Sequence, residues 1–127
     1  MALREYFECH KGYGVLATAN SKGEPSAAVY SAPAEVRENE ISFLMWEKQT
    51  YKHLKENNKA CYLFFEGGKL AGGTRLFLEK IAEETDTEKV LGLKKAHYPE
   101  AKMDGERVLH LVTFKVTGQV PLVGSGE

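Results

Sequence analysis

The residues best suited to chemistry lie in the segment from Trp46 to Leu54. This segment joins the end of an apolar run to a stretch with helical spacing, and the first N–H groups of a helix lack partners within the helix. Lys48, Lys52 and the hydroxyl of Thr50 add positive charge and hydrogen-bond donors at the same place. The combination is suited to a phosphate group. The alternative is that the lysines form a solvated helix face and Thr50 only caps the helix, and the residues alone leave both interpretations open.

Common motifs that bind nucleotides or activate nucleophiles are missing. The sequence has no Gly-x-Gly-x-x-Gly turn, no Walker loop and no Gly-x-Ser-x-Gly elbow. The four histidines, His10, His53, His97 and His110, are scattered, and none lies four residues from another histidine or a cysteine. We therefore expect no metal site. We interpret His110, which alternates with apolar residues, as a hydrogen-bonded wall residue. Because the sequence shows no acid–base pair, no catalytic residue is assigned.

Length and composition predict one ordinary globular domain. The 127 residues are 43% hydrophobic and 28% charged, which argues against disorder and fibrous structure. The net charge of −1, from 17 basic and 18 acidic residues, lacks the basic excess of a nucleic-acid-binding protein.

No apolar run approaches the length of a membrane span, and the first residues include an acidic side chain and no apolar stretch. We therefore expect no membrane partner and no signal peptide, and we expect a cytoplasmic location. The two cysteines, Cys9 and Cys61, are expected to be reduced and buried.

Six strands are expected to position the phosphate-binding segment. Apolar and β-branched runs separated by turn residues predict strands at Val15–Asn20, Ala27–Ala32, Ile41–Trp46, Ala60–Phe65, Arg75–Glu84 and Arg107–Thr117. Because most strands follow one another without long helices between them, an antiparallel sheet is expected. Closing that sheet into a barrel would remove its exposed edges.

Three short helices are expected around this sheet. Helical spacing predicts one from Leu3 to His10, a second from Gln49 to Asn58 that starts near Thr50, and a third that ends near His97. The sequence from Thr85 to Glu88 fits a capping box for the third helix, and Tyr98-Pro99 is expected to end it. Residues 1–127 are read as a single domain, with 120–127 as a loose tail.

Four segments in order resemble the pyridoxamine 5′-phosphate oxidase-like family of FMN-binding split barrels, and most closely its short stand-alone FMN-binding proteins. Gly14–Asn20 with Lys22–Pro25 looks like the opening hairpin of that family. Ile41–Trp46 followed by Lys48-Gln49-Thr50 looks like its flavin strand and phosphate turn. Leu54–Ala60 is similar to its helix end, and Gly73–Leu78 to its next strand entry. Together these motifs span roughly residues 10 to 117.

Two departures from the family limit what the resemblance implies. Many members carry Ser-Arg-Lys at the phosphate turn, where this sequence has Lys48, Gln49 and Thr50, so one cation has moved and one is lost. The true oxidases also carry a C-terminal extension that holds pyridoxal phosphate. This sequence ends shortly after Val120-Pro121-Leu122 and lacks that extension, so the resemblance does not imply vitamin B6 chemistry.

The resemblance implies a six-stranded antiparallel split β-barrel that binds FMN at the interface of a homodimer. By the same resemblance, the FMN-binding residues would be Val29, Tyr30, Ser31, Met45, Trp46, Lys48, Gln49, Thr50, Gly73 and Thr74. Two classes of function follow. One is a small flavin oxidoreductase or electron carrier with an unidentified small-molecule substrate or redox partner. The other is a non-catalytic binding module with haem, a deazaflavin or no cofactor.

Overall fold

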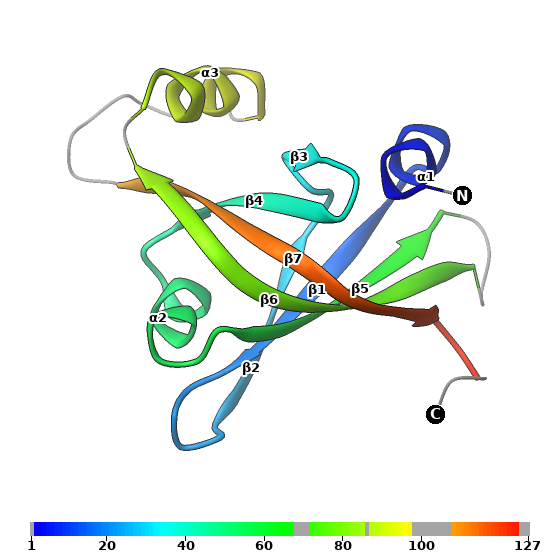
Figure 1. Cartoon of the computed structure of the whole chain (residues 1–127), viewed down its shortest axis with the longest axis horizontal. Helices are drawn as coiled ribbons and strands as arrows, with labels where there is room; N and C mark the ends of the chain where they lie inside the picture. Colours follow the sequence, from blue (N-terminus) through cyan, green and yellow to red (C-terminus); the bar gives the residue numbers. More distant parts are fainter. Residues whose placement is uncertain (1, 68–71, 86, 98–107, 125–127) are drawn as a thin grey trace.

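A computed structural model describes residues 2–67, 72–85, 87–97 and 108–124 (Figure 1). The elements are α1 (Leu3–Cys9), β1 (Gly12–Ala19), β2 (Pro25–Tyr30), β3 (Glu35–Val36), β4 (Glu40–Trp46), α2 (Gln49–Glu56), β5 (Lys59–Glu66), β6 (Gly73–Thr85), α3 (Glu88–His97) and β7 (Leu109–Pro121). The predicted helix end at Tyr98-Pro99, the predicted strand start at Arg107 and residues 125–127 of the predicted tail lie outside the described residues. None of the described helices is both long enough and apolar enough to span a membrane.

The strands form a single antiparallel sheet in the order β2-β1-β5-β6-β7-β4-β3. The sequence predicted six strands, and the described residues form seven. The additional strand, β3, has two residues and pairs Val36 with Ile41 of β4. Two residues are too few for an alternating pattern, so the sequence indicated only a hairpin tip there.

The sheet curls until strands at opposite ends of its order come into contact. The rings of Tyr30 on β2 and Phe43 on β4 have centroids 5.6 Å apart. The main core fills the curled sheet, and its largest fully buried side chains include Phe43, Tyr62, Phe64 and Phe114. Helix α1 packs against this core through Phe7, whose ring lies 5.0 Å from that of Phe64.

A second, smaller core lies beneath α3. It joins Leu44, Val90, Leu109 and Leu111, with Trp46 packed against it. Strand β4 is therefore buried on both faces, since Phe43 points into the main core and Leu44 into the smaller one. Burial of both faces explains why residues 41–46 form a nearly continuous apolar run instead of an alternating one.

The capping residue of α3 differs from the predicted one. The hydroxyl of Thr87 accepts a hydrogen bond from the backbone N–H of Val90 at 3.2 Å, so Thr87 caps the helix. Thr85, the predicted cap, is the last residue of β6 and pairs with His110 of β7. Thr85 and Thr87 are two residues apart. Thr87 is the cap because β6 extends through Thr85.

Strand β7 also runs further than the sequence predicted. Val120 and Pro121, which we assigned to a loose tail, pair with Arg75 and Thr74 of β6. Strand β7 continues through Gly118, which lies against the Phe77 side chain of β6.

Candidate functional site

A cavity of about 380 Å³ lies between the end of β2 and the turn from β4 into α2. Its volume is within the ~300–1,000 Å³ range of small-molecule sites. The walls mix aromatic, aliphatic and hydroxyl side chains with one lysine: Ser26, Ala28, Val29, Tyr30, Ser31, Ala32, Ala34, Leu44, Met45, Trp46, Lys48, Gln49 and Thr50. The curl of the sheet creates this cavity, because it brings β2 and β4 together.

Eight of the ten predicted site residues line this one cavity: Val29, Tyr30, Ser31, Met45, Trp46, Lys48, Gln49 and Thr50. The other two, Gly73 and Thr74, pair with Phe65 and Phe64 of β5 and are not among its lining residues. Their contact with a ligand stays a prediction. The sequence missed Ser26, Ala28, Ala32, Ala34 and Leu44. Small side chains such as these carry no chemical signal, and only the folded structure reveals their position.

The β2 wall is held in place by a buried tyrosine. Tyr62 on β5 is fully buried, and its hydroxyl donates a hydrogen bond to the backbone carbonyl of Tyr30 at 2.8 Å. Burial raises the pKa of Tyr62 above its ordinary value, so the group stays protonated and keeps donating. Gly14 makes this arrangement possible, because a Cβ there would lie 2.3 Å from Cζ of Tyr62.

The opposite wall is the turn that starts α2. Lys48 is the N-cap residue and makes no side-chain capping bond. Its backbone N–H donates to the carbonyl of Trp46 at 2.8 Å. Thr50 lies inside the helix and is buried, so the alternative interpretation in which it only caps α2 is wrong. The partial positive charge of a helix start, together with the lysine, favours an anion at this end of the cavity.

Trp46 lies between the cavity and α3. The Lys94 ammonium group lies 5.4 Å from the centroid of the Trp46 ring, a cation–π contact, and the Lys94 side chain is buried. Nothing in the sequence distinguished Lys94, because it is one of several lysines in the third predicted helix. This contact fixes a cation behind an aromatic wall of the cavity.

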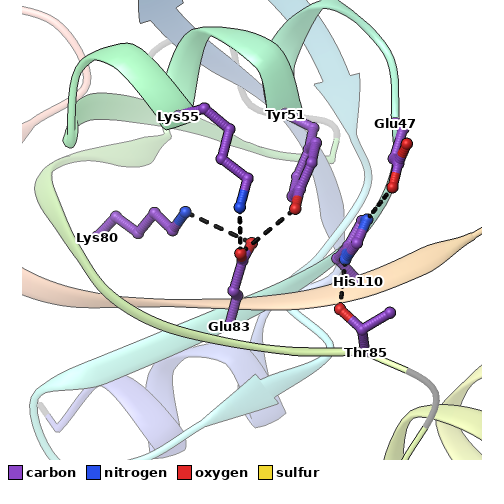
Figure 2. A network of polar contacts seen from close by, with 7 residues as sticks. All are labelled: Glu47, Tyr51, Lys55, Lys80, Glu83, Thr85 and His110. Atoms are coloured by element: carbon purple, nitrogen blue, oxygen red, sulfur yellow. Dashed lines mark hydrogen bonds and ion pairs between the residues drawn. The ribbon is translucent and has the colours of Figure 1, made fainter.

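His110 on β7 holds Glu47, the residue between Trp46 and Lys48, in place, as Figure 2 shows. Its Nε2 lies 2.8 Å from a carboxylate oxygen of Glu47, and its Nδ1 lies 2.6 Å from the hydroxyl of Thr85. Its ring stacks on Tyr51 with centroids 4.0 Å apart. The expectation that His110 is a hydrogen-bonded residue of the barrel wall is confirmed. The hydroxyl–imidazole–carboxylate order resembles that of a nucleophile with its base, but neither Thr85 nor His110 lines the cavity.

Glu83 on β6 anchors the other end of the same turn (Figure 2). Its carboxylate accepts hydrogen bonds from the Tyr51 hydroxyl at 3.3 Å, from Lys55, and from Lys80 at 3.4 Å. Burial alone would raise the pKa of Glu83, but the hydrogen bonds and the lysine charges outweigh it, and the pKa lies below its ordinary value. Glu47 and Tyr51 therefore hold the segment between them against β6 and β7.

Among residues 2–67, 72–85, 87–97 and 108–124, no three His, Cys, Asp or Glu side chains gather as metal ligands. Both cysteines are free thiols. Cys61 is half-buried, whereas Cys9 is exposed, so the expectation that both are buried is wrong for Cys9. Cys9 is the last residue of α1 and lies on its outer side, where the helix does not touch the core.

Comparison with known proteins gives a fold and no close relative. No protein-family model and no curated protein matches the sequence. Among solved structures, an FMN-binding protein from Syntrophomonas wolfei subsp. wolfei matches with a TM-score of 0.74 and 20% identity, over 95% of this chain and 84% of that one. A pyridoxinephosphate oxidase family protein from Clostridium acetobutylicum matches with a TM-score of 0.66 and 20% identity, over 91% and 82%.

HutZ, the haem storage protein from Vibrio cholerae, also matches, with a TM-score of 0.62 and 15% identity, over 94% of this chain and 91% of that one. These likenesses establish the fold class. The chain has the split β-barrel fold shared by these proteins. Because structures of this type serve different cofactors, the fold does not by itself decide which one this chain binds.

Proposed function

We propose that this protein is an FMN-binding flavoprotein that transfers electrons as a homodimer. The observation that carries the proposal is the cavity between β2 and the start of α2, which combines aromatic walls with an anion-favouring end. An isoalloxazine ring needs flat apolar walls, and a phosphate needs donors and positive charge. The aromatic walls of this cavity are suited to the ring, and its end at the start of α2 is suited to the phosphate.

Different cavity residues would hold different parts of the cofactor. Val29, Tyr30 and Ser31 on one wall and Met45 and Trp46 on the other would hold the ring. Lys48, Gln49 and Thr50 would hold the phosphate, together with the N–H groups at the start of α2. The flavin supplies the redox chemistry, while the protein binds it, orients it and adjusts its electrostatic surroundings. The likeness to an FMN-binding split barrel supports the assignment.

A second copy of the chain would complete the site. The outer sheet face, which we define as Tyr13, Val15, Val29, Leu63, Phe65 and Phe77, extends across β2, β1, β5 and β6 and is mostly apolar, with Arg75 of β6 paired with Leu63. Three of these side chains are strongly exposed in the single chain: Tyr13 at 56%, Val29 at 72% and Phe77 at 43%. An apolar face of this kind is typical of a protein interface. Val29 belongs both to this face and to the cavity wall, so the face and the cavity are continuous.

Haem is the second candidate cofactor, because a haem storage protein shares the fold. Haem iron is most often held by an axial histidine or cysteine, and neither residue type is among the described residues that line the cavity, whose Tyr30 and Met45 belong to the less common ligand types. Flavin is therefore favoured. The absorption spectrum of the purified protein separates the two, since flavin gives two visible bands and haem gives one intense Soret band.

Removing the cation beside the proposed phosphate position tests the assignment. We expect Lys48→Gln to weaken FMN binding about tenfold to a hundredfold, since a lost hydrogen bond to a charged group costs about 1.5–3 kcal/mol and ~1.4 kcal/mol corresponds to one decade. Riboflavin, which lacks the phosphate, should bind almost as well as before. Titration by the quenching of flavin fluorescence measures both affinities.

Lys52→Gln is the matched control, because Lys52 is an exposed lysine one turn further along α2 and does not line the cavity. Its effect on FMN should be within about twofold. Equal losses of FMN and riboflavin in Lys48→Gln would contradict the assignment, since they would show that the turn supports the fold and not the phosphate.

A further inference from the structure

Three side chains connect the cavity to the interior of the barrel. Gln49, which lines the cavity, has its amide Nε2 2.8 Å from Nε2 of His53, one turn further along α2. The other ring nitrogen of His53, Nδ1, lies 3.1 Å from the hydroxyl of Thr18 on β1. His53 and Thr18 are both buried, at 3% and 5% exposure, whereas Gln49 is exposed.

The donor and acceptor roles along this chain depend on one another. A neutral imidazole carries one N–H donor and one acceptor nitrogen. In the arrangement that the structure holds, the Gln49 amide N–H donates to Nε2 of His53, so Nδ1–H of His53 donates to the Thr18 hydroxyl. The amide oxygen of Gln49 and its second N–H are then left for the cavity.

A second arrangement satisfies the same three residues with every role reversed. The Thr18 hydroxyl donates to Nδ1, and Nε2–H of His53 donates to the amide oxygen of Gln49. The amide N–H₂ is then left for the cavity. The two arrangements differ by the tautomer of His53 and a rotation of one amide, and both keep the buried ring nitrogens paired, as burial requires.

The two arrangements offer opposite chemistry to a ligand. Gln49 is the first residue of α2 and follows Lys48, so its amide lies at the anion-favouring end of the cavity. An amide oxygen repels an anion there, whereas an amide N–H₂ donates to it. An anion bound at this place therefore stabilises the second arrangement over the first.

We propose that Thr18, His53 and Gln49 form a tautomer relay, in which an anionic group at the start of α2 turns the Gln49 amide while His53 gives up its Nδ1 proton to water and takes a proton from water at Nε2, so that the ring stays neutral. The relay rests on the proposed function, since the FMN phosphate is the anion in question. His53 and Thr18 are positioning residues that never touch the ligand. The relay makes the cavity prefer phosphate-bearing ligands over neutral ones of the same shape.

Nitrogen-15 spectroscopy of the histidine rings tests the relay, because the protonated and unprotonated nitrogens of a neutral imidazole resonate far apart. His53 is assigned by comparison with His53→Gln, which lacks its signals. We expect Nδ1 to carry the proton in the protein alone and with riboflavin, and Nε2 to carry it with saturating FMN or inorganic phosphate. An unchanged Nδ1–H form with both anions would overturn the relay, as would protonation of both nitrogens.

The same titrations keep the relay and the proposed function distinguishable. Flavin fluorescence reports whether FMN binds, independently of the tautomer. Binding of FMN without a tautomer change leaves the FMN function standing and overturns the relay. A tautomer change with inorganic phosphate, but no flavin binding, leaves the relay standing and overturns the FMN function.

Replacing the Gln49 amide with a carboxylate, which accepts hydrogen bonds but does not donate them, allows a second test through the affinities for FMN and riboflavin. Gln49→Glu presents carboxylate oxygens to both His53 and the cavity, so we expect FMN binding to weaken more than tenfold while riboflavin changes by less than about threefold. Asn39→Asp is the matched control, since Asn39 is an exposed amide between β3 and β4 and does not line the cavity. Equal weakening of the two ligands in Gln49→Glu would overturn the relay.

Discussion

Gly14 is a residue whose side chain must be absent for the cavity to have its shape. A Cβ at this position would lie 2.3 Å from the ring of Tyr62, and the ring cannot retreat because Tyr62 is fully buried in the main core. The hydroxyl of that ring holds the carbonyl of Tyr30 at the cavity wall. One missing methyl group therefore links β1 to the position of a wall residue on β2.

Adding that methyl group should cost both stability and ligand binding. We expect Gly14→Ala to lower the free energy of unfolding by about 1–3 kcal/mol, the usual cost of overpacking a well-filled core. The displaced Tyr62 should also release the carbonyl of Tyr30 and weaken flavin binding. Urea denaturation followed by fluorescence measures the stability, and a flavin titration measures the affinity.

Gly92→Ala is the matched control, because a Cβ on this glycine of α3 meets nothing within 4 Å. Alanine replaces glycine in a helix there, so the protein should gain roughly 0.5–1 kcal/mol. Equal tolerance of the two substitutions would show that the Tyr62 ring has room to move.

At the residue scale, the sequence indicated the site better than it indicated how the site is built. The cluster around Lys48 was recognisable because charge, a hydroxyl and a strand-to-helix junction coincide within a few positions. The relay was not, because Thr18 and His53 are 35 residues apart and only the packing of α2 on β1 brings them together. Thr50 misled us, since a threonine near a predicted helix start suggests a cap until the helix is known to begin earlier.

At the scale of elements, α2 depends on contacts made by its first two turns. Tyr51 and Lys55 both bind Glu83 on β6, and Glu47, just before the helix, binds His110 on β7. These contacts join the short helix to the two longest strands of the sheet. An eight-residue helix has little stability alone, so its position depends on this network.

Neutralising Glu83 should destabilise the protein in a pH-dependent way. The pKa of Glu83 is lower in the folded protein than its ordinary value of 4.5. The carboxylate therefore contributes stability that is fully present above about pH 4.5 and is lost as the pH falls through the lower folded value. We expect Glu83→Gln to cost about 1 kcal/mol at pH 7, and we expect that gap from the unsubstituted protein to close in acid. Urea midpoints across the pH range measure it.

Glu8→Gln serves as the control for an exposed carboxylate. Glu8 forms an ion pair with Arg4 on α1, and these side chains are 64% and 74% exposed. Its removal should cost no more than about 0.5 kcal/mol. A gap for Glu83→Gln that stays constant through the acid range would show that the charge of the carboxylate does not stabilise the protein.

The sequence predicted the elements well where their apolar pattern was complete. All six predicted strands and all three helices are present, with ends shifted by a few residues. The sequence did not predict which strands lie next to each other in the sheet. The pairing of β4 with β7 joins Ile41 to Phe114, and nothing in either strand's own pattern names the other as its partner.

At the scale of the whole molecule, the proposed homodimer makes a direct prediction about the outer sheet face. We expect the protein to sediment at micromolar concentration with twice the 14.2 kDa mass of one chain. Phe77→Lys places a charge on the β6 side of the proposed interface. An unpaired buried charge costs about 3 kcal/mol or more, so dimerisation should weaken on the order of 100-fold, and the variant should sediment as a single chain.

Leu91→Lys adds the same charge at an apolar residue of α3 with similar exposure, 37% against 43% for Phe77. Leu91 is not part of the outer sheet face, so this variant should remain dimeric. A single-chain mass for the unsubstituted protein would contradict the dimer, and dissociation by both variants would contradict the choice of face.

The strand order also governs when the cavity can exist during synthesis. Strand β4 supplies one wall of the cavity, yet its sheet partners are only β3 and β7, and β7 is the last of the described strands to be translated. A nascent chain therefore carries every lining residue, from Ser26 to Thr50, well before residues 109–121 fix β4 in the sheet. The proposed cofactor would therefore be loaded only after β7 has been translated and has paired with β4.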